Sequence, residues 1–140
     1  MEMNEKATAI VDKMMETDAY SQWLGIEHLE KKVGYSRIRM VVRPEMVNGF
    51  GIAHGGISYS FADSAFAFAS NSQGRKAVSI ETSISHLAAI QVGDTLIAIA
   101  RQESLTHRVG VYTVEVNNQD GKKVALFKGT VYRSSSEWDV

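Results

Sequence analysis

The sequence predicts a single α+β domain in which an antiparallel sheet curls around one long, buried helix. Two features of the chain carry this prediction. The stretch 48–71 is rich in small and apolar residues, and Asp63 is the only formally charged side chain between Glu45 and Arg75. Segments rich in Val, Ile, Thr and Tyr flank it and are joined by short turns, which connect antiparallel neighbours. Since a helix without a polar face must be enclosed on nearly all sides, the sheet should wrap around it.

Length and composition restrict the possible classes of protein. With 140 residues, 44% of them hydrophobic and 22% charged, the chain fits one globular domain spanning 1–140. Its net charge of −1 offers no electrostatic case for binding nucleic acid, and no basic arm is visible. The absence of cysteine excludes disulfides and thiolate chemistry. Charged residues in the first twenty positions exclude a signal-peptide core, and glycines make 46–62 a poor membrane span, so we expect a cytoplasmic protein.

The elements are expected in the following order. Apolar residues at helical spacing predict a helix within 1–20, with Asn4 as its cap. The polar segment 134–140 is expected to be a flexible tail. Pro44 ends the second of six expected strands. These strands cover 27–32, 35–42, 76–87, 95–105, 109–117 and 123–132.

This arrangement corresponds to the hotdog fold, and specific motifs support it. Asn48-Gly49 precedes His54-Gly55-Gly56 by a few residues, and Asp63 follows in the segment 61–67. Together with the Gly-Asp-Thr-Leu sequence at 93–96, these motifs resemble those of hotdog-fold acyl-CoA thioesterases. The greatest similarity is to the phenylacetic-acid-degradation (PaaI-type) branch. The resemblance covers roughly 20–133, nearly the whole domain, and implies hydrolysis by water without a cofactor.

The resemblance implies a role for each matching residue. Asp63 matches the catalytic carboxylate, acting either as general base on water or as nucleophile. Gly55 matches the residue whose backbone N–H polarises the thioester carbonyl, and Asn48 a side chain that holds that carbonyl or the water. His54 matches a residue near the leaving thiolate, and Ser79 a hydroxyl that orients water.

Four further residues are expected to contact substrate, and one family contact is missing. Gly56 would let the substrate approach the helix terminus, Phe50 lies in the preceding loop, and Ser64 follows the catalytic carboxylate. Arg108 is a candidate for the phosphates of coenzyme A. Relatives often carry Leu-Arg-Pro where this chain has Leu-Ala-Ala at 87–89, so the corresponding arginine contact is absent.

Spacing along the helix predicts self-association. Gly55 and Asp63 are eight residues apart, which corresponds to about 12 Å along a helix. A general base must act within about 3 Å of its water, so the two residues cannot serve one substrate from the same helix. We therefore expect a homodimer with two shared active sites. The resemblance agrees, and it suggests that two dimers pair into a tetramer.

Other interpretations of the sequence remain open. A hydroxyacyl-thioester dehydratase on the same fold is one alternative, and a non-catalytic acyl-CoA binding protein is another. Asp63 could be a structural carboxylate, His54 could satisfy loop backbone groups, and Asn48 could serve only its turn. No histidine spacing indicates a metal site, and no Gly-x-Ser-x-Gly elbow indicates a serine hydrolase.

Overall fold

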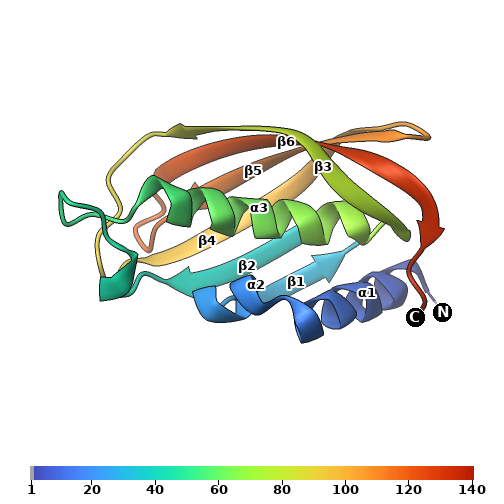
Figure 1. Ribbon diagram of the computed structural model, residues 1–140, viewed down its shortest axis with the longest axis horizontal. Helices are drawn as coiled ribbons and strands as arrows, with labels where there is room; N and C mark the ends of the chain where they lie inside the picture. The colour runs from blue at the N-terminus through green and yellow to red at the C-terminus, as the bar shows by residue number, and fades with distance from the viewer. Residues whose placement is uncertain (1) are drawn as a thin grey trace.

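The computed structural model describes residues 2–140 and shows a six-stranded antiparallel sheet curled around one central helix (Figure 1). The strand order is β1-β2-β4-β5-β6-β3, so β1 and β3 form the two edges. The predicted α+β hotdog fold is thereby confirmed. The elements in chain order are α1 (Met3–Thr17), α2 (Ala19–Leu24), β1 (Glu27–Lys32), β2 (Tyr35–Val41), a 3₁₀ turn (Pro44–Met46), α3 (Gly55–Asn71), β3 (Arg75–His86), β4 (Thr95–Leu105), β5 (Val109–Asn117) and β6 (Lys123–Glu137).

The core lies between α3 and the concave face of the sheet. Phe66, fully buried on α3, packs its ring against the rings of Tyr112 on β5 and Phe127 on β6, at centroid distances of 5.9 and 5.5 Å. Gly129 on β6 lies opposite this ring, and a Cβ at that position would come within 2.6 Å of Phe66. The close approach of helix and sheet therefore requires glycine here.

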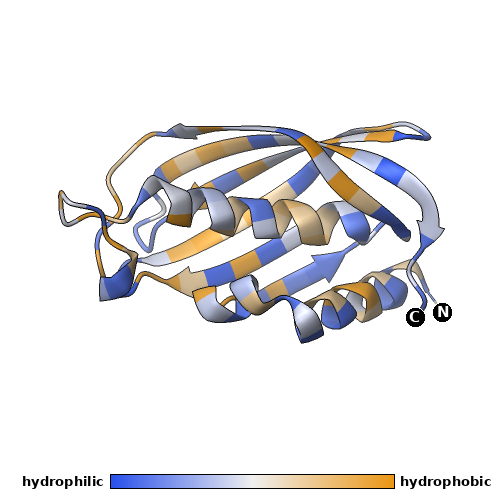
Figure 2. Ribbon diagram, in the orientation of Figure 1, coloured by the Kyte–Doolittle hydropathy of each residue, from blue (hydrophilic) through white to orange (hydrophobic). Residues whose placement is uncertain are grey.

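The strands alternate as the sequence predicts. On β2, Ile38 and Met40 are fully buried under α3, whereas Arg37 and Arg39 lie on the outer face. Figure 2 shows this alternation as orange and blue segments along β2. Period-two patterning of this kind places one face of a strand on the core and the other in solvent.

The N-terminal region differs from the expected single helix. The chain forms two helices that meet at Asp18, whose carboxylate accepts hydrogen bonds from the backbone N–H and the hydroxyl of Ser21. A side chain of this kind caps a new helix and thereby ends the preceding one. Asn4 is not the N-cap of α1: it lies inside the helix, and its side chain accepts a hydrogen bond from the N–H of Val33.

The C-terminal region also differs from expectation. Five of the predicted strands agree with the structure to within one residue at each end, but β6 continues to Glu137 instead of ending at Tyr132. Its last residue pairs with Arg75 on β3. Beyond it, the indole N–H of Trp138 donates to the side-chain oxygen of Asn71 at 3.0 Å. The predicted end of the last strand at 132 is therefore wrong, and strand pairing together with this indole contact ties part of the expected tail, 134–140, to the body of the protein.

Within residues 2–140, none of the helices combines the length and apolar character needed to cross a membrane.

Candidate functional site

The N-terminus of α3 carries the first group of predicted site residues. His54 is the N-cap, and its Nδ1 accepts a hydrogen bond from the Gly56 N–H at 2.8 Å. The Gly55 N–H has no hydrogen-bond partner within residues 2–140. Unpaired N–H groups in the first helical turn, with the positive end of the helix dipole behind them, attract negative charge on a ligand. The Gly55 N–H is thus a suitable donor to a developing oxyanion.

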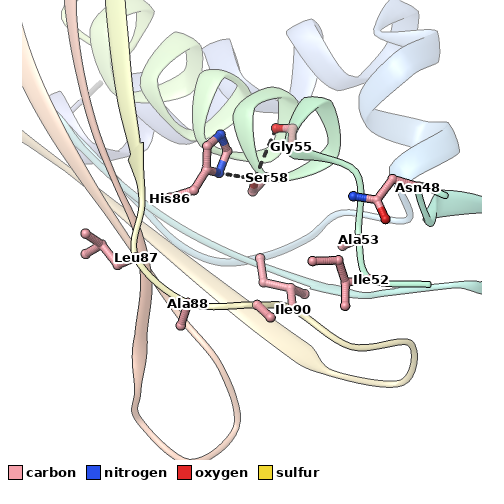
Figure 3. Close-up of a pocket in the computed structure, with 10 residues that line it drawn as sticks. Asn48, Ile52, Ala53, Gly55, Ser58, His86, Leu87, Ala88 and Ile90 are labelled. Atoms are coloured by element: carbon pink, nitrogen blue, oxygen red, sulfur yellow. Dashed lines mark hydrogen bonds between the residues drawn. The ribbon is translucent and has the colours of Figure 1, made fainter. Parts of the chain in front are cut away.

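A cavity of about 370 Å³ lies at this helix terminus (Figure 3). Most of its lining is apolar or small, and His86 is its only titratable side chain. The position where relatives often carry arginine is occupied by Ala88, so no cation is available there for a phosphate. The lining residues are Asn48, Ile52, Ala53, Gly55, Ser58, His86, Leu87, Ala88, Ala89 and Ile90.

His86 and Ser58 belong to this cavity and were not predicted from the sequence. The Ser58 hydroxyl donates to the Gly55 carbonyl at 3.1 Å and lies 3.2 Å from His86 Nδ1. The direction of the second contact is set by the tautomer of the His86 ring. No motif marks the pair, because His86 at the end of β3 meets α3 only through the curvature of the sheet. The spacing of the histidines along the sequence does not indicate this contact.

The loop before α3 positions Asn48 at the cavity and Phe50 away from it. The Asn48 side-chain oxygen accepts a hydrogen bond from the Phe50 N–H at 2.9 Å, so it serves the local turn. The same side chain also lines the cavity, which leaves its amide N–H groups available there (Figure 3). Phe50 is 90% exposed at the tip of the loop and lines none of the three cavities at α3.

Asp63 lies two turns further along α3 in a second cavity of about 280 Å³. Asp18, Tyr20, Ser60 and Ser64 line this cavity with it. No hydrogen bond or ion pair to the Asp63 carboxylate is found among residues 2–140. Burial raises the pKa of the Asp63 carboxyl, and the negative charge of Asp18 raises this pKa further. The carboxylate is therefore a stronger base than an exposed aspartate.

The structure separates the predicted site residues into several groups. Gly55 and Asn48 share the first cavity, whereas Asp63 and Ser64 share the second. His54 and Gly56 line a third cavity of about 390 Å³ beside them.

Besides Phe50, two further predicted residues, Ser79 and Arg108, line none of these cavities. Ser79 is exposed on the edge strand β3. Arg108 lies in the turn between β4 and β5, at the end of the molecule away from the α3 N-terminus, and donates to the Arg133 carbonyl at 3.2 Å (Figure 1). One chain alone therefore does not bring these two residues to the helix terminus.

One face of α3 and one edge of the sheet remain uncovered in the single chain. Gly56 is exposed, and the face that continues through Ser60, Asp63 and Ala67 is only half-buried, so the expectation of burial on nearly all sides is only partly met. This face is polar or small, which permits close approach of another surface. At the edge of the sheet, Val78 and Ile80 on β3 are each 60% exposed.

No group of three or more His, Asp or Glu side chains in the described chain, 2–140, is arranged to hold a metal ion.

Comparisons with known proteins relate this fold and site to a family. The model of the thioesterase superfamily matches residues 50–125. The chain is 40% identical to the acyl-coenzyme A thioesterase PaaI of Escherichia coli K12, covering 94% of each protein. The structure of the E. coli PaaI protein, from the phenylacetic acid degradation operon, matches with a TM-score of 0.95, covering 97% of this chain and 99% of that one at 38% identity.

Two further solved structures show the same architecture. A variant of the phenylacetic acid degradation protein PaaI from Thermus thermophilus matches at 38% identity with a TM-score of 0.81, covering 84% of this chain and all of that one. A Streptococcus mutans protein bound to acetyl CoA matches at 26% identity with a TM-score of 0.78, covering 81% of this chain and 91% of that one.

Fold and family match together define the class of this protein as a thioester hydrolase built on the hotdog scaffold. The chain belongs to the thioesterase superfamily, in its PaaI-type branch.

Proposed function

We propose that this protein hydrolyses acyl-CoA thioesters to a free acid and coenzyme A, with Asp63 as the catalytic carboxylate. The observation that carries the proposal is the isolated Asp63 itself, half-buried on an apolar helix without a hydrogen-bond partner within residues 2–140. Burying an unpaired carboxylate is energetically unfavourable, so its presence here favours a functional role. The E. coli relative named as an acyl-coenzyme A thioesterase and the S. mutans structure with acetyl CoA support the substrate class.

The proposed reaction uses water and no cofactor. Asp63 removes one proton from a water molecule as the water oxygen forms a bond to the thioester carbonyl carbon. The Gly55 N–H donates to the resulting oxyanion, a contribution worth about 3–4 kcal/mol in comparable sites. When the intermediate collapses, the carbon–sulfur bond breaks, and the coenzyme A thiolate takes up the proton held by Asp63. A covalent route with Asp63 as nucleophile gives the same products, because water then hydrolyses the acyl-aspartate anhydride.

We further propose that each active site is shared between two chains. In one chain, Gly55 and Asp63 are separated by about 12 Å and line different cavities. An antiparallel α3 from a second copy would bring its own Asp63 to the Gly55 terminus of the first. The uncovered face of α3 and the apolar edge strand β3 support a homodimer with two-fold symmetry. Pairing of two dimers into a tetramer stays a prediction.

We also propose roles for the remaining site residues, and the structure supports some of these roles more directly than others. Asn48 lines the Gly55 cavity and has amide donors for the carbonyl or the water. His54 fixes the helix terminus and is proposed to lie near the leaving thiolate. The other proposed contacts depend on how two chains meet. They are those of Gly56, Ser64 and Phe50 with substrate, of Ser79 with water and of Arg108 with coenzyme A phosphates.

A panel of acyl-CoA thioesters, with free thiol as the readout, tests the proposal. We expect thiol release by the natural protein and none above background by Asp63→Asn, which stays folded because the amide has nearly the same shape. Release by Asp63→Asn at the natural rate would contradict the assignment of Asp63. Conversion of hydroxyacyl-CoA without thiol release would indicate a dehydratase, and binding without any conversion would indicate a carrier.

A further inference from the structure

We infer that Asp18 and Ser21 are positioning residues for the hydrolytic water. Through a chain of hydrogen bonds, they hold the Ser64 hydroxyl so that its oxygen acts only as an acceptor in the cavity of Asp63. This inference rests on the proposed function, since it concerns the water that Asp63 activates. Both positioning residues lie outside the segment 50–125 that matches the superfamily model.

The geometry of the chain fixes the direction of each hydrogen bond. Asp18 accepts from the Ser21 backbone N–H at 3.0 Å through Oδ1 and from the Ser21 hydroxyl at 2.6 Å through Oδ2. The Ser21 oxygen then lies 2.8 Å from the Ser64 oxygen. Since the only hydroxyl proton of Ser21 is donated to a carboxylate, Ser64 must be the donor in the second contact. The Ser64 hydroxyl then has no proton left to donate, so its oxygen can only accept further hydrogen bonds.

Ser64 differs from the other serines of α3 in this respect. Ser58, Ser60 and Ser70 each donate to a carbonyl of α3 itself, at 3.1, 2.7 and 3.3 Å. Ser64 instead contacts α2, through Ser21, which is only 1% exposed. Binding to an internal helix carbonyl is the usual arrangement for serine within a helix. The contact to α2 therefore holds the Ser64 side chain away from its own backbone.

An acceptor beside Asp63 has a direct consequence for the attacking water. The water donates one O–H to the Asp63 carboxylate and the other to the Ser64 oxygen, which leaves an oxygen lone pair for the carbonyl carbon. The first proton moves to Asp63, and the second stays on the oxygen that enters the product acid. If Ser64 donated to the water instead, it would engage one of the two lone pairs on the water oxygen and make that oxygen less nucleophilic. Besides Asp63, the titratable side chains lining this cavity are Asp18 and Tyr20.

Ser21→Ala tests the positioning role, because it removes the hydroxyl relay but keeps the Asp18 charge. We expect kcat to fall about 3- to 10-fold, which corresponds to one hydrogen bond, with KM changed less than about 2-fold. Ser21→Thr keeps a hydroxyl and should retain most of the activity. Ser70→Ala is the matched control, since Ser70 donates within α3 and lines none of the three cavities. Its kcat should equal that of the natural protein.

Two further variants separate positioning from general damage. Adding Ser21→Ala to Ser64→Ala should cause no further loss, because the relay acts only through Ser64. Asp18→Asn keeps a capping residue but removes the charge that raises the pKa of Asp63. The acidic limb of its kcat/KM profile should therefore move to lower pH, whereas that of Ser21→Ala should not move.

The outcomes distinguish this inference from the proposed function. If Asp63→Asn is inactive while Ser21→Ala has the natural kcat, the positioning role is overturned and the proposed function stands. If the losses of Ser21→Ala and Ser64→Ala multiply in the double variant, the relay is likewise overturned. Full activity of Asp63→Asn would overturn the proposed function itself.

Discussion

The imidazole ring of His86 lies directly against Gly55 at the N-terminus of α3. A Cβ at position 55 would be 3.2 Å from Nε2 and 3.4 Å from Cε1 of this ring. The contact limits the residue at 55 to glycine unless the ring moves, and it places one titratable side chain beside the proposed oxyanion donor. Two contacts thus constrain the N-terminus of α3: the hydrogen bond from the Gly56 N–H to His54, and the packing of the His86 ring against Gly55.

Two substitutions of Gly55 distinguish the effect of losing its backbone N–H from the effect of adding a side chain. Gly55→Ala keeps the N–H and displaces the His86 ring by a few tenths of an ångström, so kcat should fall less than about 10-fold. Gly55→Pro removes the N–H, and proline suits the first helical position. The preceding His54, at φ −60° and ψ 140°, has a conformation compatible with a following proline.

For Gly55→Pro we expect a loss of about 10²–10³ in kcat, the effect of removing one oxyanion donor. Steady-state thiol release measures both variants, and thermal melting checks that each is folded. Equal activities of the alanine and proline variants would show that the N–H does not polarise the carbonyl.

Asp63 should reduce stability at neutral pH. Because burial and then Asp18 raise its pKa in the folded state, the folded protein binds the Asp63 proton more tightly than the unfolded chain does. This contribution to stability is present at low pH and is lost as the pH rises through the raised folded pKa. Asp63→Asn has no group that titrates at this position, so the variant does not lose stability as the pH rises. Its melting temperature should therefore exceed that of the natural protein by an amount that grows from about pH 4 to about pH 7. A difference in melting temperature that does not change with pH would contradict this linkage.

Gly129→Ala should destabilise the fold, because the added Cβ would come within 2.6–2.8 Å of the Phe66 ring. Overpacking of this kind costs about 1–3 kcal/mol, which urea unfolding measures. Gly49→Ala is the matched control, since a Cβ there meets nothing within 4 Å, and its effect should stay within about 0.5 kcal/mol. Combining Gly129→Ala with Phe66→Leu should cost less than the sum of the single variants. Additive costs would show that the two residues do not compete for this space.

Trp138→Phe tests whether the end of the chain contributes to stability. The change removes the indole donor to Asn71, whose side-chain oxygen still accepts from the Ala77 N–H at 3.0 Å. Since no buried acceptor is left unpaired, the free energy of unfolding should fall by about 1 kcal/mol. An unchanged urea midpoint would mean that the indole contact contributes nothing to stability.

The fold was largely predictable because hydrophobic period and turn residues are local signals. Alternation at Ile38 and Met40 indicates a strand of the sheet, and the apolar run around Asp63 indicates the central helix. The break at Asp18 was missed because a cap residue between two apolar stretches also fits one continuous helix. The end of β6 was missed because Ser134–Ser136 have weak strand propensity, and pairing with β3 overrides it.

The candidate site was predictable only where it lies in one motif. Asn48, Gly55 and Asp63 are close in sequence, so their spacing could be interpreted directly. His86 and Asp18 reach the site through sheet curvature and through α2, and neither produces a short-range pattern. Arg108 and Ser79 do not belong to this motif, and the single chain places both away from the Gly55 cavity.

The shared active site is tested most directly by mixing two inactive variants. Asp63→Asn and Gly55→Pro, coexpressed with the same tag and purified as one unselected pool, form heterodimers in which one site has both an intact Gly55 and an intact Asp63 from opposite chains. With random pairing, half of the dimers are mixed and each has one working site, so thiol release should recover to about a quarter of the natural rate. Activity no greater than the sum of the two parent variants would show that Gly55 and Asp63 do not act across a dimer interface.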